Sequence, residues 1–109
     1  MEISNEKYND VDVLTLEGIL NAENVHQFRE FNDQLLNNKS PLVILDFERL
    51  EQIDSSGIGA VISLLKKMRT QNGDVRIIKL RGAVKQLFEL LRIDRGINIF
   101  ETLDDAIMN

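Results

Sequence analysis

The sequence has no cysteine or tryptophan, and only one histidine and one proline. Without cysteine the chain cannot form a disulfide, a thiolate zinc site or a thiol nucleophile, which is typical of proteins from a reducing compartment. The residues from Met1 to Lys7 contain no apolar signal core, and no run approaches the roughly 18 apolar residues of a membrane span. We therefore expect a cytoplasmic chain that is neither secreted nor inserted in a membrane.

An excess of basic residues is also missing. The chain has 13 Lys and Arg against 18 Asp and Glu, which gives a formal charge of -5. Proteins that bind nucleic acid need a basic face, so a nucleic acid is an unfavourable partner. A length of 109 residues with 43% hydrophobic content predicts one domain, residues 1–109, with one core.

The usual equipment of an enzyme is absent too. His26 lies on the polar side of a predicted helix without a neighbouring carboxylate or second histidine, and we interpret it as a solvated surface residue. There is no G-x-S-x-G elbow. Gly57 and Gly59 lack the third glycine of a dinucleotide fingerprint, and no Gly-Lys-Ser/Thr follows them. We expect no catalytic residue, no metal site and no cofactor.

The first half of the chain predicts a hairpin, a helix and a central strand. A strand reaches a turn at Asn9-Asp10, after which residues 11–17 alternate in polarity up to Gly18. Apolar residues at helical spacing predict an amphipathic helix from Ala22 to Asn37. The run from Leu42 to Leu45 is apolar throughout, as expected for a strand covered on both faces.

The second half alternates helices and strands. A helix is predicted from the apolar stripe Ile58, Val61, Ile62, Leu65 and Met68, with its cap within residues 54–56 and its end near residues 72–73. A strand at residues 75–78, a helix after Gly82, a strand at residues 97–100 and a terminal helix capped by Thr102 follow. The order ββαβαβαβα, with about four helices, predicts an α/β fold with a mixed, mostly parallel sheet beside the hairpin.

The segment from Ile53 to Gly59, Ile-Asp-Ser-Ser-Gly-Ile-Gly, carries the most information about function. It places two hydroxyls and a carboxylate where a helix begins. A serine there can cap free N–H groups, and the helix dipole also tolerates a phosphate. The pattern therefore favours a phosphorylatable switch over an active site, although it does not choose between Ser55 and Ser56. A plain capping turn is the simpler alternative.

The two glycines of this segment also need a reason. A glycine within a helix costs about 1 kcal/mol relative to alanine, so two in the first turn indicate a close approach by something else. Small residues form a strip beside the apolar stripe, namely Ser56, Gly59, Ala60 and Ser63. The strip is either a flat docking surface for another protein or the place where the helix start packs against a neighbouring loop.

In this motif and in the order of strands and helices around it, the chain resembles the STAS domain family over nearly its whole length. It is most similar to the stand-alone bacterial anti-sigma factor antagonists. The matching segments are the hairpin end Leu16 to Asn21, the central strand Val43 to Phe47, the motif Ile53 to Gly59 and the third helix Val84 to Phe88. The Asp-Ser-Ser-Gly-Ile-Gly element is specific when it follows an apolar strand and opens a helix.

The resemblance implies that Ser55 accepts phosphate from a partner that is both an anti-sigma factor and an ATP-dependent serine kinase. The unphosphorylated antagonist would bind this kinase and displace the sigma factor, and a serine phosphatase would restore the hydroxyl. The chain would then be a substrate and a ligand without activity of its own. The implied partner-binding residues are Asn21, Asp54, Ser55, Ser56, Gly57, Ile58 and Gly59.

The chain departs from the family pattern in two places. Asn21 stands where these antagonists usually carry Asp, and Leu91-Arg92-Ile93 replaces a turn with a small residue and a glycine. Asn21 accepts a hydrogen bond but supplies no charge, so it would repel a nearby phosphate less than Asp does.

Two other functions stay open: a STAS scaffold in a transporter-associated or other signalling assembly, where Ser55 only caps, and binding of a small nucleotide or lipid.

Overall fold

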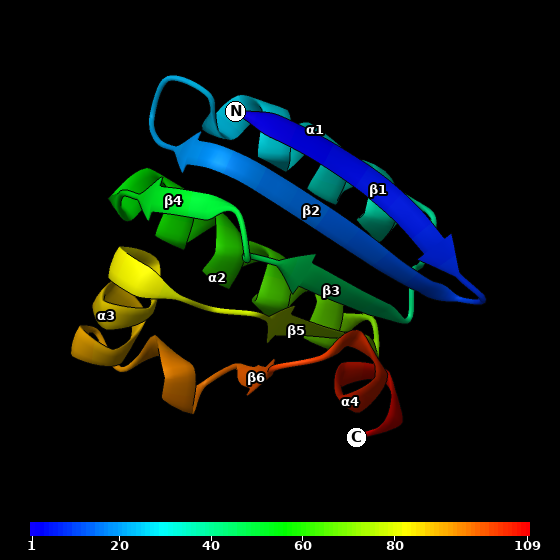
Figure 1. Ribbon diagram of the computed structural model, residues 1–109. Coiled ribbons are helices and arrows are strands. Elements are labelled where there is room, and N and C mark those ends of the chain that lie inside the picture. The colour runs from blue at the N-terminus through cyan, green and yellow to red at the C-terminus, as the bar shows by residue number, and fades with distance from the viewer.

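The chain folds around a mixed β-sheet of six strands, shown in Figure 1 as the computed structural model of residues 1–109. The strand order is β1-β2-β3-β5-β6, and β4 pairs with β2 outside this path. The elements in chain order are β1 (Glu2–Tyr8), β2 (Val11–Leu20), α1 (Val25–Asn37), β3 (Leu42–Asp46), β4 (Leu50–Ile53), α2 (Ser55–Thr70), β5 (Asp74–Ile78), α3 (Gly82–Leu90), the 3-10 helix η1 (Ile93–Arg95), β6 (Asn98–Phe100) and α4 (Leu103–Met108).

The pairing confirms the predicted hairpin and the mostly parallel sheet. Strands β1 and β2 are antiparallel, whereas β2–β3, β3–β5 and β5–β6 are parallel. The hairpin turn is made possible by Asn9, whose φ of 57° lies in the left-handed region that Asn tolerates. Strand β3 lies at the centre, and its residues Val43, Ile44 and Leu45 are all fully buried, as their unbroken apolar run predicts.

Strand β4 is the one strand that the sequence pattern does not predict, and the short 3-10 helix η1 is also absent from the predicted order. Only Leu50 and Ile53, its first and last residues, are buried, so it shows neither alternation nor a continuous apolar run. It pairs in parallel with the end of β2, and the register of this pairing shifts between Gly18, opposite Leu50, and Ile19, opposite Gln52. Gly18 has a φ of +103°, which a residue with a side chain rarely adopts. The result is that Leu20 lies opposite Ile53.

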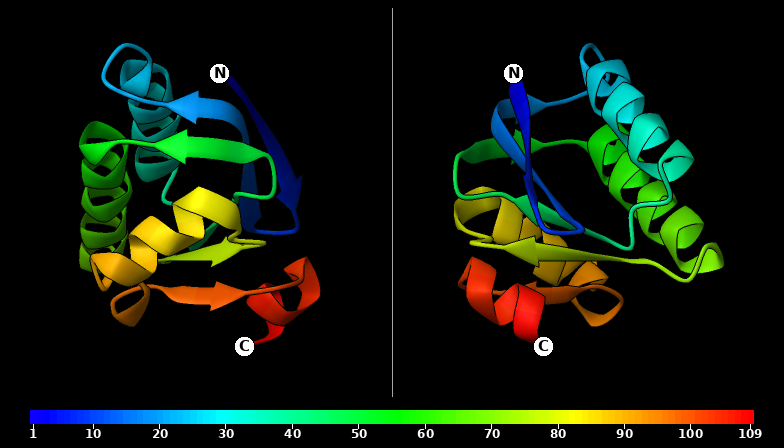
Figure 2. Two further views of the ribbon diagram at one scale, coloured as in Figure 1. Left: turned by 60° about the vertical axis from the view of Figure 1, so that its left-hand side comes forward. Right: turned by 90° about the vertical axis from the view of Figure 1, so that its right-hand side faces the viewer.

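Helices cover both faces of the sheet. Helices α1 and α2 lie side by side on one face and α4 on the other (Figure 2). The larger core cluster, with 22 buried residues, includes Phe28 of α1, Met68 of α2 and Phe88 of α3. A smaller cluster lies under α4 and consists of Val13, Ile44, Ile78 and Ala106. None of the helices is both long enough and apolar enough to cross a membrane.

The helix boundaries agree with the sequence patterns except at the start of α1 and at the end of α2, which ends at Thr70 rather than near residues 72–73. The first helix begins at Val25 rather than Ala22, because residues 22–24 form a turn before it. Helix α2 begins at Ser55 after an Asp54 cap, within the predicted segment. The Thr102 side chain accepts a hydrogen bond of 3.1 Å from the Asp105 N–H, which confirms the predicted cap of the terminal helix.

A buried polar pair joins the loop after α1 to strand β2, and it gives a test of the fold. The Ser40 hydroxyl donates to the Asp12 carboxylate at 2.5 Å, and both residues are only 4% exposed. Ser40→Ala removes this donor from a buried carboxylate and should lower the free energy of unfolding by about 1.5–3 kcal/mol in urea titrations. Ser4→Ala, on exposed β1, should change it by less than about 0.5 kcal/mol. Equal stability of the two variants would contradict this role.

Candidate functional site

The loops that follow β2 and β4 meet at one end of the sheet and form the candidate site. The pairing of Leu20 with Ile53 brings the residues after both strands together. The Asp54 N–H donates to the Leu20 carbonyl at 3.1 Å, and the Ala22 N–H donates to the Asp54 Oδ2 at 3.1 Å. Asn21 and the start of α2, predicted from sequence as parts of one site, therefore lie side by side.

Asp54 is the cap of helix α2. Its backbone is extended, and its Oδ1 accepts a hydrogen bond of 3.1 Å from the Gly57 N–H. Its other oxygen holds the Ala22 N–H, so both carboxylate oxygens are engaged by backbone donors. The position that the sequence left open between residues 54 and 56 is thus occupied by Asp54.

Ser55 and Ser56 follow as the first two residues of the helix. The Ser55 side chain is exposed and Ser56 is half-buried. The side-chain hydrogen bonds at this helix start come from Asp54 and do not involve the Ser55 hydroxyl. Ser55 is therefore free of the capping role and is an exposed residue at the positive end of the helix dipole.

The Asn21 side chain forms hydrogen bonds within the loop between β2 and α1. Its Oδ1 accepts hydrogen bonds from the N–H groups of Glu23 at 3.0 Å and Asn24 at 3.3 Å. An Asp at this position would accept the same two bonds, so the substitution noted in the sequence changes the charge and keeps the loop geometry.

Asn24 is a residue of this loop that the sequence analysis missed. Its Oδ1 accepts from the Asn21 N–H at 3.0 Å, and its Nδ2 donates to the Ile19 carbonyl at 2.7 Å. Two Asn residues three positions apart before a helix are a pattern of reciprocal side-chain capping, which is the signal that could have identified Asn24.

The two glycines of the motif have different environments. A Cβ on Gly57 would lie 2.7 Å from the Ile53 Cγ1 and 2.8 Å from the Leu20 Cγ, so the close approach at Gly57 comes from within the chain. A Cβ on Gly59 would meet no atom within 4 Å. Ile58 is only 7% exposed and packs in the core. Of the predicted partner-binding residues after Ser56, only Gly59 presents an open surface.

The strip of small residues on α2 is divided between two surroundings. Gly59 is exposed and Ser56 is half-buried, whereas Ala60 is 1% exposed and packs in the core. Ala60 and Ser63 also line a pocket together with residues of α1. The strip is therefore not one continuous docking surface, because its C-terminal half faces helix α1.

A second exposed region lies beside the C-terminal half of α2. Helix α3 ends at Leu90, and Leu90 and Leu91 are 76% and 52% exposed. Arg92 follows with a φ of 59°, in the left-handed region where glycine is favoured, so the chain holds an arginine at a strained position. An open apolar groove of about 370 Å³ adjoins it, lined by Ile62, Leu65, Lys66, Arg69, Leu91, Arg92, Ile93 and Gly96.

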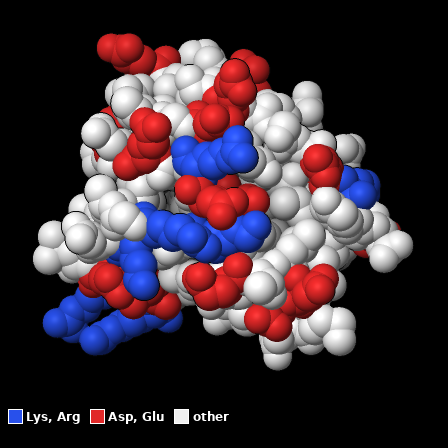
Figure 3. Space-filling view, viewed as in Figure 1, with Lys and Arg blue, Asp and Glu red and all other residues white.

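The charged side chains form no cluster that could hold a metal ion, and they are mixed in sign on the face seen in Figure 3. No group of three or more His, Asp and Glu side chains could hold a metal ion. His26 is exposed on α1. On the face seen in Figure 3, Lys and Arg lie among Asp and Glu. The ion pairs of the chain include Lys79–Glu48 at 3.8 Å and Arg81–Glu101 at 3.6 Å.

Removal of the Asp54 side chain tests its role as the cap. Asp54→Ala should lower the free energy of unfolding by about 1–2 kcal/mol, because two backbone donors lose their acceptor. Asp54→Asn keeps one carbonyl oxygen and should lose about half as much. Ser55→Ala should change the stability by less than about 0.5 kcal/mol. Urea unfolding measures all three, and a Ser55→Ala variant as unstable as Asp54→Ala would assign the cap to the wrong residue.

The glycines give a matched pair of alanine variants. Gly57→Ala should destabilise the chain by about 1–3 kcal/mol, because the new methyl group enters packed side chains. Gly59→Ala should stabilise it by about 0.5–1 kcal/mol, since the site is open and helical. Thermal and urea unfolding of the two variants should therefore shift in opposite directions, and a shift in the same direction would show that the environments are not as described.

Comparison with known proteins identifies the same family as the sequence resemblance. Residues 2–106 match the model of the STAS domain family. A Thermotoga maritima protein named "Putative anti-sigma factor antagonist" is 28% identical over 99 residues, which are 90% of this chain and 88% of that protein. A crystal structure under this name, from the same organism, has a TM-score of 0.91 at 26% identity and covers 97% of this chain and 92% of the other.

The fold is also that of SpoIIAA from Bacillus, solved in its phosphorylated form, with a TM-score of 0.77 at 22% identity and coverage of 97% and 96%. In this chain, β2 and β4 deliver Asn21 and Asp54 to one end of the sheet, and Asp54 starts the helix that bears Ser55. With a family match over nearly every residue, the chain belongs to the STAS domain family and is similar to bacterial anti-sigma factor antagonists.

Proposed function

We propose that the chain is a cytoplasmic anti-sigma factor antagonist that is switched by phosphorylation of Ser55. In its hydroxyl form it binds an anti-sigma factor with serine kinase activity, which releases a sigma factor. Phosphorylation by this kinase ends the binding, and a serine phosphatase restores it. The observation that carries the proposal is that Asp54 supplies the helix cap while the Ser55 hydroxyl is exposed and unused.

The geometry favours Ser55 over Ser56 as the acceptor. Ser55 is exposed, whereas Ser56 is half-buried. A kinase must bring the γ-phosphate in line with the hydroxyl, which requires access from solvent. Neither hydroxyl is needed for the cap, so access is the property that distinguishes them.

A phosphate at Ser55 is compatible with the folded state. It adds about -1.5 to -2 charges at the start of α2, where the helix dipole contributes roughly 0.3–1 kcal/mol in its favour. The Gly57 and Ile58 N–H groups are already bonded to Asp54, so they keep the helix start in place. The Ser55 and Ser56 N–H groups have no partner within the helix and lie nearest to the phosphate.

The phosphate acts on the partner instead. In the hydroxyl form, the partner packs on Ser55, Ser56 and Gly59 and on the loop that begins at Asn21. Gly59 has no packing reason within the chain, which supports a close approach by a partner at that point. The phosphate would have to be desolvated in this contact, and a penalty of about 3 kcal/mol weakens binding on the order of 100-fold.

The scaffold alternative, in which Ser55 only caps its helix, receives no support from this geometry. The cap belongs to Asp54. The exposed residues Leu90 and Leu91 are a further surface on which the same kinase could extend its contact, since large apolar side chains in solvent often mark interfaces.

Three serine variants test the switch. The cognate kinase can be recovered from a native lysate, and phosphate can be mapped by mass spectrometry after addition of ATP and magnesium. Wild type and Ser56→Ala should carry phosphate on Ser55, and Ser55→Ala should bind the kinase without being phosphorylated. Ser55→Asp should bind about 100-fold more weakly than Ser55→Ala. Phosphate on Ser56, or equal affinity of the two Ser55 variants, would contradict the proposal.

A further inference from the structure

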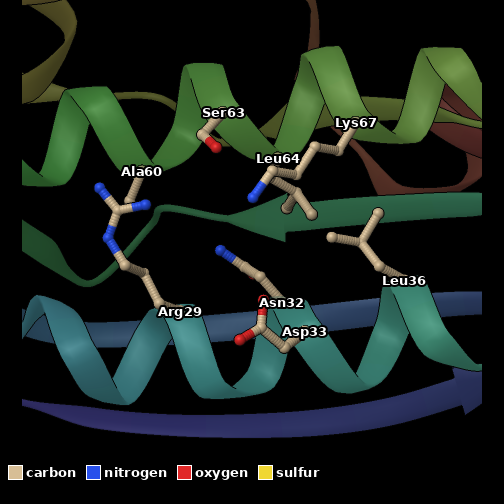
Figure 4. A pocket seen from close by; sticks show the side chains of 8 residues that line it. All are labelled: Arg29, Asn32, Asp33, Leu36, Ala60, Ser63, Leu64 and Lys67. Atoms are coloured by element: carbon tan, nitrogen blue, oxygen red, sulfur yellow. The ribbon is translucent and has the colours of Figure 1, made fainter.

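A second site lies between helices α1 and α2, on the helical face of the domain. The pocket has a volume of about 190 Å³, and we call it the α1–α2 groove. It is lined by Arg29, Asn32, Asp33 and Leu36 of α1 and by Ala60, Ser63, Leu64 and Lys67 of α2 (Figure 4). Ala60 is five residues along the helix from Ser55, a rise of about 7.5 Å. The groove is therefore distinct from the helix start that carries the motif.

The cations of the groove have no partner in the chain. Four other cations each lie within 4 Å of a carboxylate, namely Arg69, Arg76, Lys79 and Arg81. Arg29 and Lys67 form no such pair, although Asp33 lines the same groove and acidic residues outnumber basic ones, 18 to 13. Figure 4 shows Arg29 reaching toward α2 and Lys67 reaching back over the groove. Two unpaired positive charges thus face one small cavity.

A buried amide adds a second and independent observation. Asn32 is 5% exposed, and its Oδ1 is buried without a hydrogen-bond partner. Its side chain points into the space between the helices, with the amide nitrogen toward the groove (Figure 4). An unpaired buried polar atom costs about 1–3 kcal/mol, and a leucine at this helical position would avoid that cost. The unpaired oxygen is an acceptor and cannot bind an anion, whereas the amide nitrogen is a donor that faces the groove and forms no hydrogen bond within the chain.

We propose that the α1–α2 groove binds a small organic oxyanion. Arg29 and Lys67 supply the charge, while the Asn32 amide and the Ser63 hydroxyl supply hydrogen bonds to the ligand's oxygens. Leu36, Ala60 and Leu64 form an apolar wall for a short carbon skeleton. The volume lies below the roughly 300–1,000 Å³ of pockets for drug-sized ligands, so the ligand is smaller than a nucleotide. Its charged end is a phosphate or a carboxylate.

Titrations followed by amide NMR test this site with defined probes. Inorganic phosphate and succinate are each added up to about 10 mM, a range suited to weak sites, against sodium chloride of matched ionic strength. At least one of the two probes should give saturable shifts at residues 29–36 and 60–67 and at the Asn32 side-chain amide. A response to one probe identifies the charged group that the groove prefers. No saturable shift with either probe would overturn the proposal.

Matched variants separate a specific site from general attraction. Arg29→Gln and Lys67→Gln should each weaken binding at least tenfold, as expected for loss of a charge-assisted contact. Lys66→Gln makes the same charge change on the same helix outside the groove and should weaken it less than about twofold. Equal effects of the Lys66 and Lys67 variants would overturn the site.

Asn32→Leu should abolish binding while raising the unfolding midpoint, a combination that loss of folding cannot produce. Binding by Asn32→Leu as tight as that of wild type would contradict the role of the amide. Ser55→Ala should bind the probe as wild type does, because the groove does not depend on the phosphorylation that we propose. This variant therefore keeps the outcome for the groove distinct from the outcome for the switch.

Discussion

The rest of the site depends on the carboxylate of Asp54, which holds two backbone segments with its two oxygens. One oxygen caps α2 through the Gly57 N–H, and the other holds the loop after β2 through the Ala22 N–H. A helix start and a loop that are 32 residues apart in sequence are thereby fixed to each other. Because the Asp54 side chain accepts both hydrogen bonds, Ser55 and Ser56 are not needed as the helix cap. A hydroxyl can therefore be exposed at the start of the helix without loss of the fold.

The two helices that flank this contact bury their apolar faces against the sheet, but they do not close completely on each other. Phe28 and Met68 fill the layer beneath them, whereas the surface between them is lined by charged and polar side chains. The domain therefore presents two regions of different chemistry on one side. The start of α2 is small and open, which suits protein contact, and the groove between the helices is cationic.

Much of the fold follows from sequence patterns, because Leu42 to Leu45 form an unbroken apolar run and the stripe from Ile58 to Met68 has helical periodicity. Strand β4 does not, since only its two end residues are buried and its pairing with β2 contains a register shift that no local pattern records. The motif could be located from sequence, but the division of labour between Asp54 and Ser55 could not. This division depends on the hydrogen bond from the Ala22 N–H to the Asp54 carboxylate, which joins residues that are far apart in the sequence. The packing of the Leu20 side chain against Gly57 likewise depends on the tertiary structure, because Leu20 is far from Gly57 in the sequence.

Strand β1 forms one edge of the sheet, and six of its seven residues are exposed. An open edge is a template on which another strand can add, and proteins guard such edges with charge. Here Glu2, Glu6 and Lys7 stand along it, while the opposite edge is the three-residue β6. Strand addition is discouraged at both sides, so neither outer strand of the path from β1 to β6 is a ready template for polymerisation through the backbone.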